Sequence, residues 1–355
     1  MLMLQSNSVE TVDACLAAAQ RGLTWLLDQQ TTVGNWRQLE SEVFDAYYKG
    51  GWALAVSGQP AAAHRLLTHV QRTFFTPEGD FEPRAAPLHI DIARLYSSSY
   101  AVLAAQKLDR YEIAAPAVRY LLSQQDPEHG GFYSCKTPAG EKSRSDSMST
   151  AMSGVALLAA GQTERAILAG ECLIRMVEMQ PVVQPAVQPA AGRFFTTLDA
   201  AGRLEVTFPP EVAVWRVVEA GQTGQRWFAV GLPFAFAVLL HQATGEPRFK
   251  HLADELFAFQ SSGLEPWDVP SSGKAGWACS MLYRITGEAG YRDIALRVAR
   301  QVMGYQTAAG WFTIGPRPEP ADGEPAVFAP SIYDVTAEFV LWLTLIAANV
   351  AANVS

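Results

Sequence analysis

The chain has 355 residues, a formal net charge of −8, and 49% hydrophobic against 17% charged residues. Such a composition can bury a large core and excludes an intrinsically disordered chain. The acidic balance, with no stripe of Lys and Arg, argues against nucleic-acid binding, because contacts to phosphates need clustered positive charge.

Targeting and redox features are sparse. The apolar stretch at residues 339–350 is shorter than the roughly 18 residues that a transmembrane helix needs, so we expect no membrane span. Residues 1–13 contain no basic segment followed by an apolar one, so we expect no signal peptide. The four cysteines are scattered without a C-x-x-C pair, which predicts neither a disulfide framework nor a zinc site. We therefore expect a cytoplasmic protein without metal or cofactor.

An architectural repeat runs through the sequence. About six times, an amphipathic helical stretch leads through a turn into a helical stretch rich in Ala and Gly. The turns carry Gln and Gly, at intervals of roughly 45 to 80 residues that are typical of helical-hairpin arrays. The clearest turns are Gln30–Trp36, Gln125–Phe132 and Gln306–Trp311, with weaker echoes at Gln71–Phe81 and Gln260–Trp267.

The repeat predicts six helical hairpins, each with an outer helix followed by an inner one. Small residues crowd only the second helix of each pair, as expected for an inner ring of closely packed helices. We therefore predict an all-α fold, a single (α/α)6 toroid domain over residues 1–355, with an open helical solenoid as the alternative. In chain order, the expected pairs are 9–29 with 43–57, 61–75 with 91–107, 113–124 with 146–160, 164–179 with 227–244, 247–259 with 271–286, and 291–305 with 334–348.

The longest link joins the helices of the fourth pair. It begins with a Pro-rich spacer, and the segments 193–197 and 203–208 then flank the turn sequence Asp199-Ala-Ala-Gly202. Strand-forming residues on both sides of such a turn predict a small β-hairpin near residues 190–210.

Polar residues gather where the expected inner helices begin. In a ring, these helix starts and the preceding loops meet at one end, where unpaired N–H groups and positive dipole ends converge. A single Asp at a helix start is most often an N-cap. Several acids and arginines at one end instead indicate a site, because polar groups in an enclosed cavity are costly. The candidate catalytic residues are Asp334, Asp45 and Asp91.

Aromatic residues are interleaved with these charges. Aromatic walls with a few convergent polar groups are how small-molecule pockets are built, so we expect an aromatic-lined central cavity. The sequence contains none of the nucleotide-binding, esterase or zinc-protease motifs. The candidate substrate-binding residues are Tyr47, Tyr48, His89, Arg94, Tyr96, Arg144, Asp146, Trp215, Arg226, Trp227, Trp267, Trp277, Tyr333 and Glu338.

Two motifs resemble the squalene-hopene and oxidosqualene cyclases. Gln30-x-x-x-Gly34-x-Trp36 is similar to their Q-x-x-x-G-x-W repeat, and Asp334-Val-Thr-Ala-Glu338 is similar to the D-C-T-A-E motif of the oxidosqualene cyclases. In those enzymes the Asp protonates the substrate, so the resemblance implies a general-acid role for Asp334. The chain departs from the pattern in having Val335 in place of the Cys, in lacking the D-x-D-D form, and in having room for only one toroid.

A second resemblance is to the N-acylglucosamine 2-epimerase and six-hairpin glycosidase group. Asp126–Tyr133 followed by Thr137–Gly140 is similar to the HGGF turn and the D-x-x-G loop of that group, with Thr137 where the Asp stands. The epimerases rely on a pair of His inside the barrel, and this chain offers no such pair. The departure argues against an epimerase more than against a hydrolase that uses carboxylates.

Three functions remain open at this point. The first is a small-molecule enzyme for isomerisation, cyclisation or elimination, with Asp334 as general acid, Asp45 or Asp91 as base, and Arg94 or Arg226 holding an anionic group. The second is a carbohydrate-active enzyme, either a glycoside hydrolase or similar to a sugar epimerase. Its carboxylate pair would come from Asp91, Asp146 and Asp334. The third is a non-catalytic toroid that binds a ligand.

Cavity geometry distinguishes the three. Carboxyl groups roughly 5–10 Å apart across the cavity favour a glycosidase. A deep apolar funnel with one buried Asp favours a cyclase, and a cavity filled by its own side chains favours a binding protein. In each case we expect a small-molecule partner and a monomer or homodimer.

Overall fold

A computed structural model describes residues 2–84, 94–181, 192–315 and 327–353, with side chains described from residue 9 onward. Helices dominate the described residues and alternate between an outer and an inner layer. The outer helices are α1 (Leu2–Gln29), α3 (Pro60–Thr73), α5 (Tyr111–Ser123), α7 (Thr163–Glu178), α10 (Pro247–Ser261) and α12 (Ala289–Met303). The inner helices are α2 (Gly50–Val56), α4 (Arg94–Lys107), α6 (Ser147–Ala159), α9 (Phe228–Thr244), α11 (Gly273–Thr286) and α13 (Pro330–Ala351).

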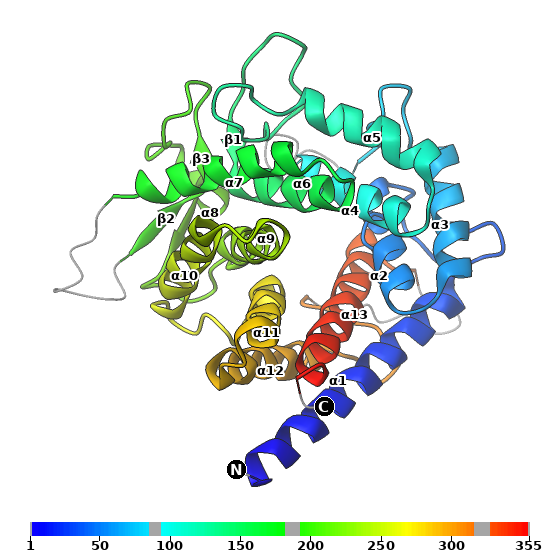
Figure 1. The fold of residues 1–355 in the computed structure, drawn as a ribbon. Coiled ribbons are helices and arrows are strands. Elements are labelled where there is room, and N and C mark those ends of the chain that lie inside the picture. The colour runs from blue at the N-terminus through cyan, green and yellow to red at the C-terminus, as the bar shows by residue number, and fades with distance from the viewer. Residues whose placement is uncertain (1, 85–93, 182–191, 316–326, 354–355) are drawn as a thin grey trace.

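The inner helices form a closed ring. Each packs against the next along the chain, and α13 packs against α2 and so joins the last repeat to the first (Figure 1). Each outer helix covers the outside of neighbouring inner helices, with α1 lying along α13. The predicted (α/α)6 toroid is confirmed, and the open solenoid is excluded. The first inner helix is shorter than predicted, because a 3-10 turn, η1 (Phe44–Ala46), precedes α2.

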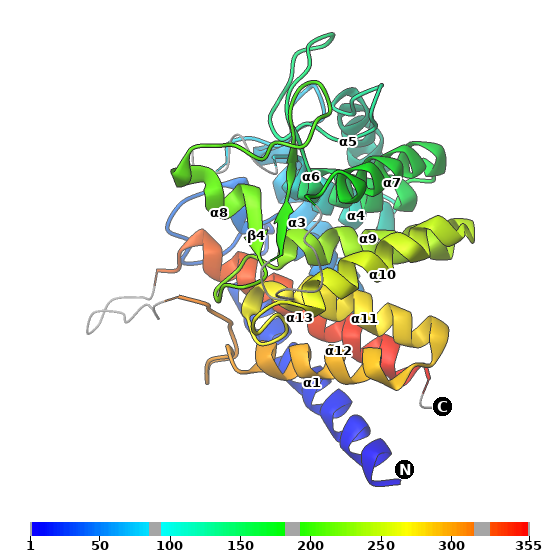
Figure 2. The same cartoon turned by 90° about the vertical axis from the view of Figure 1, so that its left-hand side faces the viewer.

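The two ends of the ring differ in the length of their connections. We call the end where the inner helices begin the N-mouth, and the end where they finish the C-mouth. Figure 2 shows the short helix α8 (Ala213–Arg216) and strand β4 (Val217–Glu219) on one side of the ring and the C-terminus on the other. At the C-mouth, two or three residues join each inner helix to the next outer one, at 57–59, 108–110, 160–162, 245–246 and 287–288. The connections at the N-mouth are longer throughout.

The repeated Gln–Gly turns tie adjacent outer helices together at the N-mouth. Gln30 Nε2 donates a hydrogen bond to Ala62 O of α3 at 3.0 Å. Gly34 has φ +98°, and a Cβ at this position would lie 2.1 Å from Arg65 O of the same helix. The motif is therefore structural here, since it fixes the spacing of outer helices around the ring. The same amide contacts join Gln125 to Arg165 O and Gln306 to Ala18 O.

Short strands stand at the N-mouth beside α6 and α9. Strand β2 (Arg193–Phe195) pairs with β4, and β3 (Thr197–Leu198) pairs with β1 (Ser145–Asp146), both antiparallel. The predicted β-hairpin is present as a narrow turn, closed by a bridge between Leu198 and Leu204. The main pairing partners of β2 and β3 lie outside residues 190–210. Strand β1 precedes α6, and β4 precedes α9.

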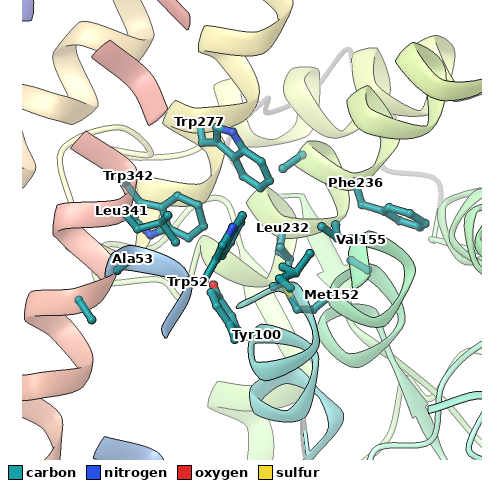
Figure 3. Close-up of a cluster of buried hydrophobic side chains, with 14 of the residues drawn as sticks. Trp52, Ala53, Tyr100, Met152, Val155, Leu232, Phe236, Trp277, Leu341 and Trp342 are labelled. Atoms are coloured by element: carbon teal, nitrogen blue, oxygen red, sulfur yellow. The ribbon is translucent and has the colours of Figure 1, made fainter. Parts of the chain in front are cut away.

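Aromatic side chains fill the middle of the ring. We call Trp52, Tyr100, Trp277 and Trp342 the aromatic plug; all four are buried and come from four different inner helices (Figure 3). The Trp277 and Trp342 rings are stacked with centroids 5.3 Å apart, and Trp52 meets Tyr100 edge-on at 5.6 Å. Met152, Leu232 and Phe236 close the far side of the plug (Figure 3). The middle of the ring is therefore packed core and leaves no open channel between the mouths along these side chains.

One described helix, α13, is long and apolar enough to cross a membrane. It is an inner helix of the ring and packs against α1, α2, α11 and α12. Its hydrophobic side chains are thus used in the core of the protein.

Candidate functional site

A cluster of four charged residues lies at the N-mouth. We call Lys49, Lys274, Asp334 and Glu338 the acid cluster. Lys49 Nζ lies 2.9 Å from Asp334 Oδ2 and also pairs with Glu338, while Lys274 pairs with the other oxygen of Glu338. The two lysine side chains are 4% and 5% exposed, whereas the Asp334 and Glu338 side chains are 21% and 15% exposed. Solvent therefore reaches the cluster from the carboxylate side.

Helix geometry explains why these residues meet. Asp334 and Glu338 are four residues apart on α13, which places both on one face of the helix. Lys49 immediately precedes α2, and Lys274 is the second residue of α11. A positive charge is unfavourable at the positive end of a helix dipole. Both lysines therefore need the carboxylates that α13 places between them.

Aromatic rings surround the two ammonium groups. Lys49 Nζ is 5.0 Å from the centre of the Tyr48 ring, and Lys274 Nζ is 5.6 Å from the rings of Tyr96 and Phe228. Trp342 Nε1 donates a hydrogen bond to Glu338 Oε1 at 3.0 Å. The rings shield the two ammonium groups from water and stabilise them through their faces.

The two carboxyl groups are shifted in opposite directions. Burial raises the pKa of Asp334, and the charge of Glu338 adds to that shift, while Lys49 opposes it. Burial also acts to raise the pKa of Glu338, but Lys274 and Lys49 outweigh it and hold that pKa well below its usual range. Asp334 Oδ1 is buried without a well-formed hydrogen bond to any described residue. A pair of acids whose pKa values are pushed apart suits general acid–base chemistry, with Asp334 the easier of the two to protonate.

Asp45 and Tyr48 belong to the same region. Asp45 is half-buried in η1. Burial raises the pKa of Tyr48 well above its usual value, and the charges of Asp334 and Asp45 contribute to that rise. The Tyr48 phenol is thus within electrostatic reach of both acids. The predicted residues His89 and Asp91 lie outside the described residues.

Arg226 occupies another part of the N-mouth, just before α9. Its guanidinium is half-buried and lies 3.4 Å from the centre of the Trp215 ring. The guanidinium makes no ion pair or hydrogen bond with any residue of the described ranges. Burial lowers its pKa. Phe228 connects this position to the acid cluster, since its ring lies 6.5 Å from that of Trp215 and 5.6 Å from Lys274 Nζ. A small cavity of about 10 Å³ separates Arg226 and Trp215 from the start of α6.

Three polar residues that we predicted to bind substrate have structural partners instead. Arg94 forms an ion pair with the buried Asp80 at 2.7 Å, so its charge is already compensated. Asp146 is the N-cap of α6 and accepts a hydrogen bond from Ser149 N at 2.8 Å. Arg144 is half-exposed and pairs with Glu205 at 3.2 Å.

Several predicted aromatic residues also lie away from the acid cluster. Tyr333 stacks on Trp36 with ring centres 5.3 Å apart, and Tyr47 stacks on the other side of the same indole at 5.8 Å. Burial in the core accounts for the positions of these residues, and Trp277 also lines a cavity at the C-mouth. The buried set is Tyr47, Trp227, Trp267, Trp277 and Tyr333.

Lys49 and Lys274 belong to the polar groups at the starts of the expected inner helices, but they were not among the predicted catalytic or substrate-binding residues. Lys49 precedes an apolar segment that starts with Gly50, and Lys274 stands in the first turn of an equally apolar helix. A basic residue at the start of an apolar helix has both the dipole and burial against it. That conflict was the available signal, and it predicts a buried anionic partner.

Neither a comparison with protein families nor one with curated proteins finds a match to this sequence. Solved structures do match. A D-mannose isomerase superposes with a TM-score of 0.62 at 11% identity, over 93% of this chain and 97% of that one. A family 76 glycoside hydrolase (mannosidase) from Bacteroides thetaiotaomicron VPI-5482 has a TM-score of 0.61 at 13% identity, over 94% and 98%.

A type II terpene cyclase from Scytonema, solved with geranylgeranyl dihydroxybenzoate as substrate, has a TM-score of 0.54 at 13% identity, over 97% of this chain and 99% of that one. At such identities the likeness concerns the fold. Both resemblances seen in the sequence are confirmed at that level, because cyclase and carbohydrate enzymes appear together among the neighbours. The chain therefore has the (α/α)6 toroid fold that these isomerases, hydrolases and cyclases share.

Proposed function

We propose that this protein is an enzyme that catalyses isomerisation or elimination of a small anionic organic molecule at the N-mouth, with Asp334 as the proton donor. The observation that carries the proposal is the pair Asp334 and Glu338, which share Lys49 but have opposite pKa shifts. General acid catalysis needs a group that is protonated near the working pH and reachable by substrate. Asp334 meets both conditions better than Glu338, because its pKa is raised and its side chain is the more exposed of the two.

Each remaining member of the cluster has a role in this scheme. Lys49 holds Asp334 through Oδ2, and the Tyr48 side chain contacts the same carboxyl group. Glu338 stays charged and fixes both lysines. Asp45 is the proposed base, and its charge and that of Asp334 both help to raise the pKa of the neighbouring Tyr48.

Arg226 supplies the anion-binding part of the proposal. A half-buried guanidinium is costly unless it is paired, and the described residues do not pair it. Stacking on Trp215 holds the planar guanidinium group in one orientation, and a fixed guanidinium can donate two parallel hydrogen bonds to a carboxylate or phosphate. We therefore assign the anionic group of the substrate to Arg226 and the reacting carbon to the vicinity of Asp334.

The packed centre of the ring decides between reaction types. Cyclisation of a long chain needs a deep apolar cavity next to the acid, and the aromatic plug fills the centre of the ring beside the acid cluster and separates the cluster from the apolar cavity at the C-mouth. A filled centre is also what we expected of a non-catalytic binding protein. The acid cluster, however, lies where the plug ends, with its two carboxylates partly open to solvent. A small substrate at the N-mouth fits these observations better than a polyprene inside the ring.

A carbohydrate is the second candidate substrate. The half-exposed rings of Tyr96 and Phe228 beside the acid cluster offer faces on which a sugar can stack. The glycosidase form of this hypothesis is weaker. Of the acids expected for that chemistry, Asp146 caps α6 and Asp334 is paired with Lys49. An acid–base isomerase of a free sugar or sugar acid does not depend on Asp146.

Exchange of substrate hydrogen with solvent tests the proposal. Purified protein is incubated in D2O with a panel of small hydroxy and keto acids, their phosphate esters, free sugars and sugar acids, and deuterium incorporation is followed by NMR. We expect wild type to label at least one compound and Asp334→Asn to label it about 10² to 10⁴ times more slowly. Asp268→Asn, which makes the same change at an exposed ion pair with Arg297, is the matched control and should keep the wild-type rate. Equal rates for the wild type and Asp334→Asn, with both proteins folded, would remove Asp334 from the mechanism.

A further inference from the structure

The C-mouth holds a cavity of about 580 Å³ that the proposed function does not use. Its floor is formed by Trp52 and Trp277, which belong to the aromatic plug, and its walls include Leu103, Val155 and Leu239. Pockets of about 300–1,000 Å³ with mainly apolar walls are typical small-molecule sites. We propose that this C-mouth cavity binds an amphipathic monocarboxylate, with its apolar body against the two indoles and its carboxylate at the rim.

The rim supplies the argument for an acidic head group. Its polar side chains are those of Gln106, Lys107 and Gln242, and none of them has a side-chain hydrogen bond or ion pair within the described ranges. Lys107 is the one charged residue of the lining, and the lining contains no acid. The position of Lys107 in the last turn of α4 is favourable for the helix dipole. The helix dipole explains why a lysine is favourable at this position. It does not explain why the side-chain amides of Gln106 and Gln242, which also line the rim, have unused hydrogen-bond donors.

The described residues do not cover the cavity. The turns at the C-mouth have two or three residues, for example 108–110 after α4 and 245–246 after α9, and these are too short to fold across it. The capping N–H groups of Ala160 and Gly245 bond to carbonyls in the last turns of α6 and α9. An occupant must therefore come from outside the described part of the chain.

The plug separates this cavity from the acid cluster, so the two sites can be tested independently. Trp277 forms the cavity floor and stacks on Trp342, whose indole bonds to Glu338 on the far side. A ligand at the C-mouth thus changes the environment of Trp52 and Trp277 without touching Asp334. Tryptophan fluorescence reports directly on the proposed site.

Decanoate, with decanol as its uncharged counterpart, is the probe. Calorimetry and tryptophan fluorescence should show saturable binding of one decanoate per chain below its micelle concentration, and binding of decanol about tenfold weaker. Lys107→Met should weaken decanoate binding about tenfold, and Lys107→Arg should retain it. Lys136→Met, at an exposed lysine outside the lining, should have no effect. Asp334→Asn should bind decanoate as wild type does, so failure of the proposed catalysis leaves this test intact.

Two blocking variants complete the experiment. Ala159→Trp and Ala243→Trp place a large side chain into the cavity from exposed rim positions, so the core is undisturbed and the proteins should fold. Each should abolish decanoate binding with little change in melting temperature. The proposal is overturned if wild type shows no saturable binding, if both blocked variants bind as wild type does, or if decanol binds as tightly as decanoate.

Discussion

The two mouths of this ring are built from the same six inner helices, yet they differ in nearly every property. At the N-mouth, long connections bring together acids, lysines and an arginine, and the Gln–Gly turns bind adjacent outer helices. At the C-mouth, short turns close the helices, four of the five that join an inner helix to the next outer one contain a glycine, and the lining is almost neutral. The difference shows that this fold confines costly charge to one end. The four charges of the acid cluster therefore depend on one another, and removal of one should leave another uncompensated.

The largest expected effect comes from removing one charge at the N-mouth. Glu338→Gln leaves two buried ammonium groups with one carboxylate between them. Breaking a buried ion pair from one side typically costs about 3–5 kcal/mol, and we expect a loss of that size in the free energy of unfolding. Chemical denaturation measures it.

Two further variants show whether the loss is specific to the buried charges. Arg203→Ala, which removes an exposed pair with Asp199, should cost about 0–1 kcal/mol. The double variant Glu338→Gln/Lys274→Met should recover most of the loss, because it removes an anion and a cation together. A loss below about 1 kcal/mol for Glu338→Gln would mean that the N-mouth is no more dependent on its charges than the exposed surface is.

A smaller effect distinguishes the glycines of the two mouths. Gly34 and Gly245 both have a positive φ, which strains any other residue. A Cβ at Gly34 would also meet Arg65 O at 2.1 Å, whereas a Cβ at Gly245 would meet nothing within 4 Å. Gly245→Ala should therefore cost only the conformational strain, about 1–2 kcal/mol. Gly34→Ala adds overpacking and should cost about 2–4 kcal/mol. Equal losses in thermal or chemical unfolding would show that the Gln–Gly turn does not hold α3 in place.

Much of the ring was predictable from the sequence because hairpin periodicity is a local signal. The expected helix at 247–259 is α10 (Pro247–Ser261) in the structure, and the closure of α13 on α2 follows from the number of repeats. The first inner helix was predicted too long, since hydrophobic spacing alone does not reveal the 3-10 turn at η1.

The site was harder to predict, because it depends on which helix starts face each other. The i, i+4 spacing places Asp334 and Glu338 together. The catalytic role of Asp334 and the substrate-binding role of Glu338 remain predictions. Nothing local indicates that Lys49 and Lys274 approach α13 from two sides. Local sequence also cannot distinguish an aromatic wall from a plug. Trp277 and Tyr333 occur in similar contexts, yet one lies in the centre of the ring and the other under the Gln–Gly turn.

The smallest expected effect is a pH dependence that only the N-mouth should show. Folding raises the pKa of Asp334 above its ordinary value of 3.8, so the folded protein binds this proton more tightly than the unfolded chain. The free energy of unfolding of wild type relative to Asp334→Asn should therefore fall as pH rises from 3.8 through the raised pKa. Lys49 opposes the shift, so the same comparison in a Lys49→Met background should show the fall extending to higher pH. Chemical denaturation across this range checks both pairs. A difference that stays flat or grows with pH would show that Asp334 is not the easily protonated acid of the cluster, and the N-mouth would then lack its proton donor.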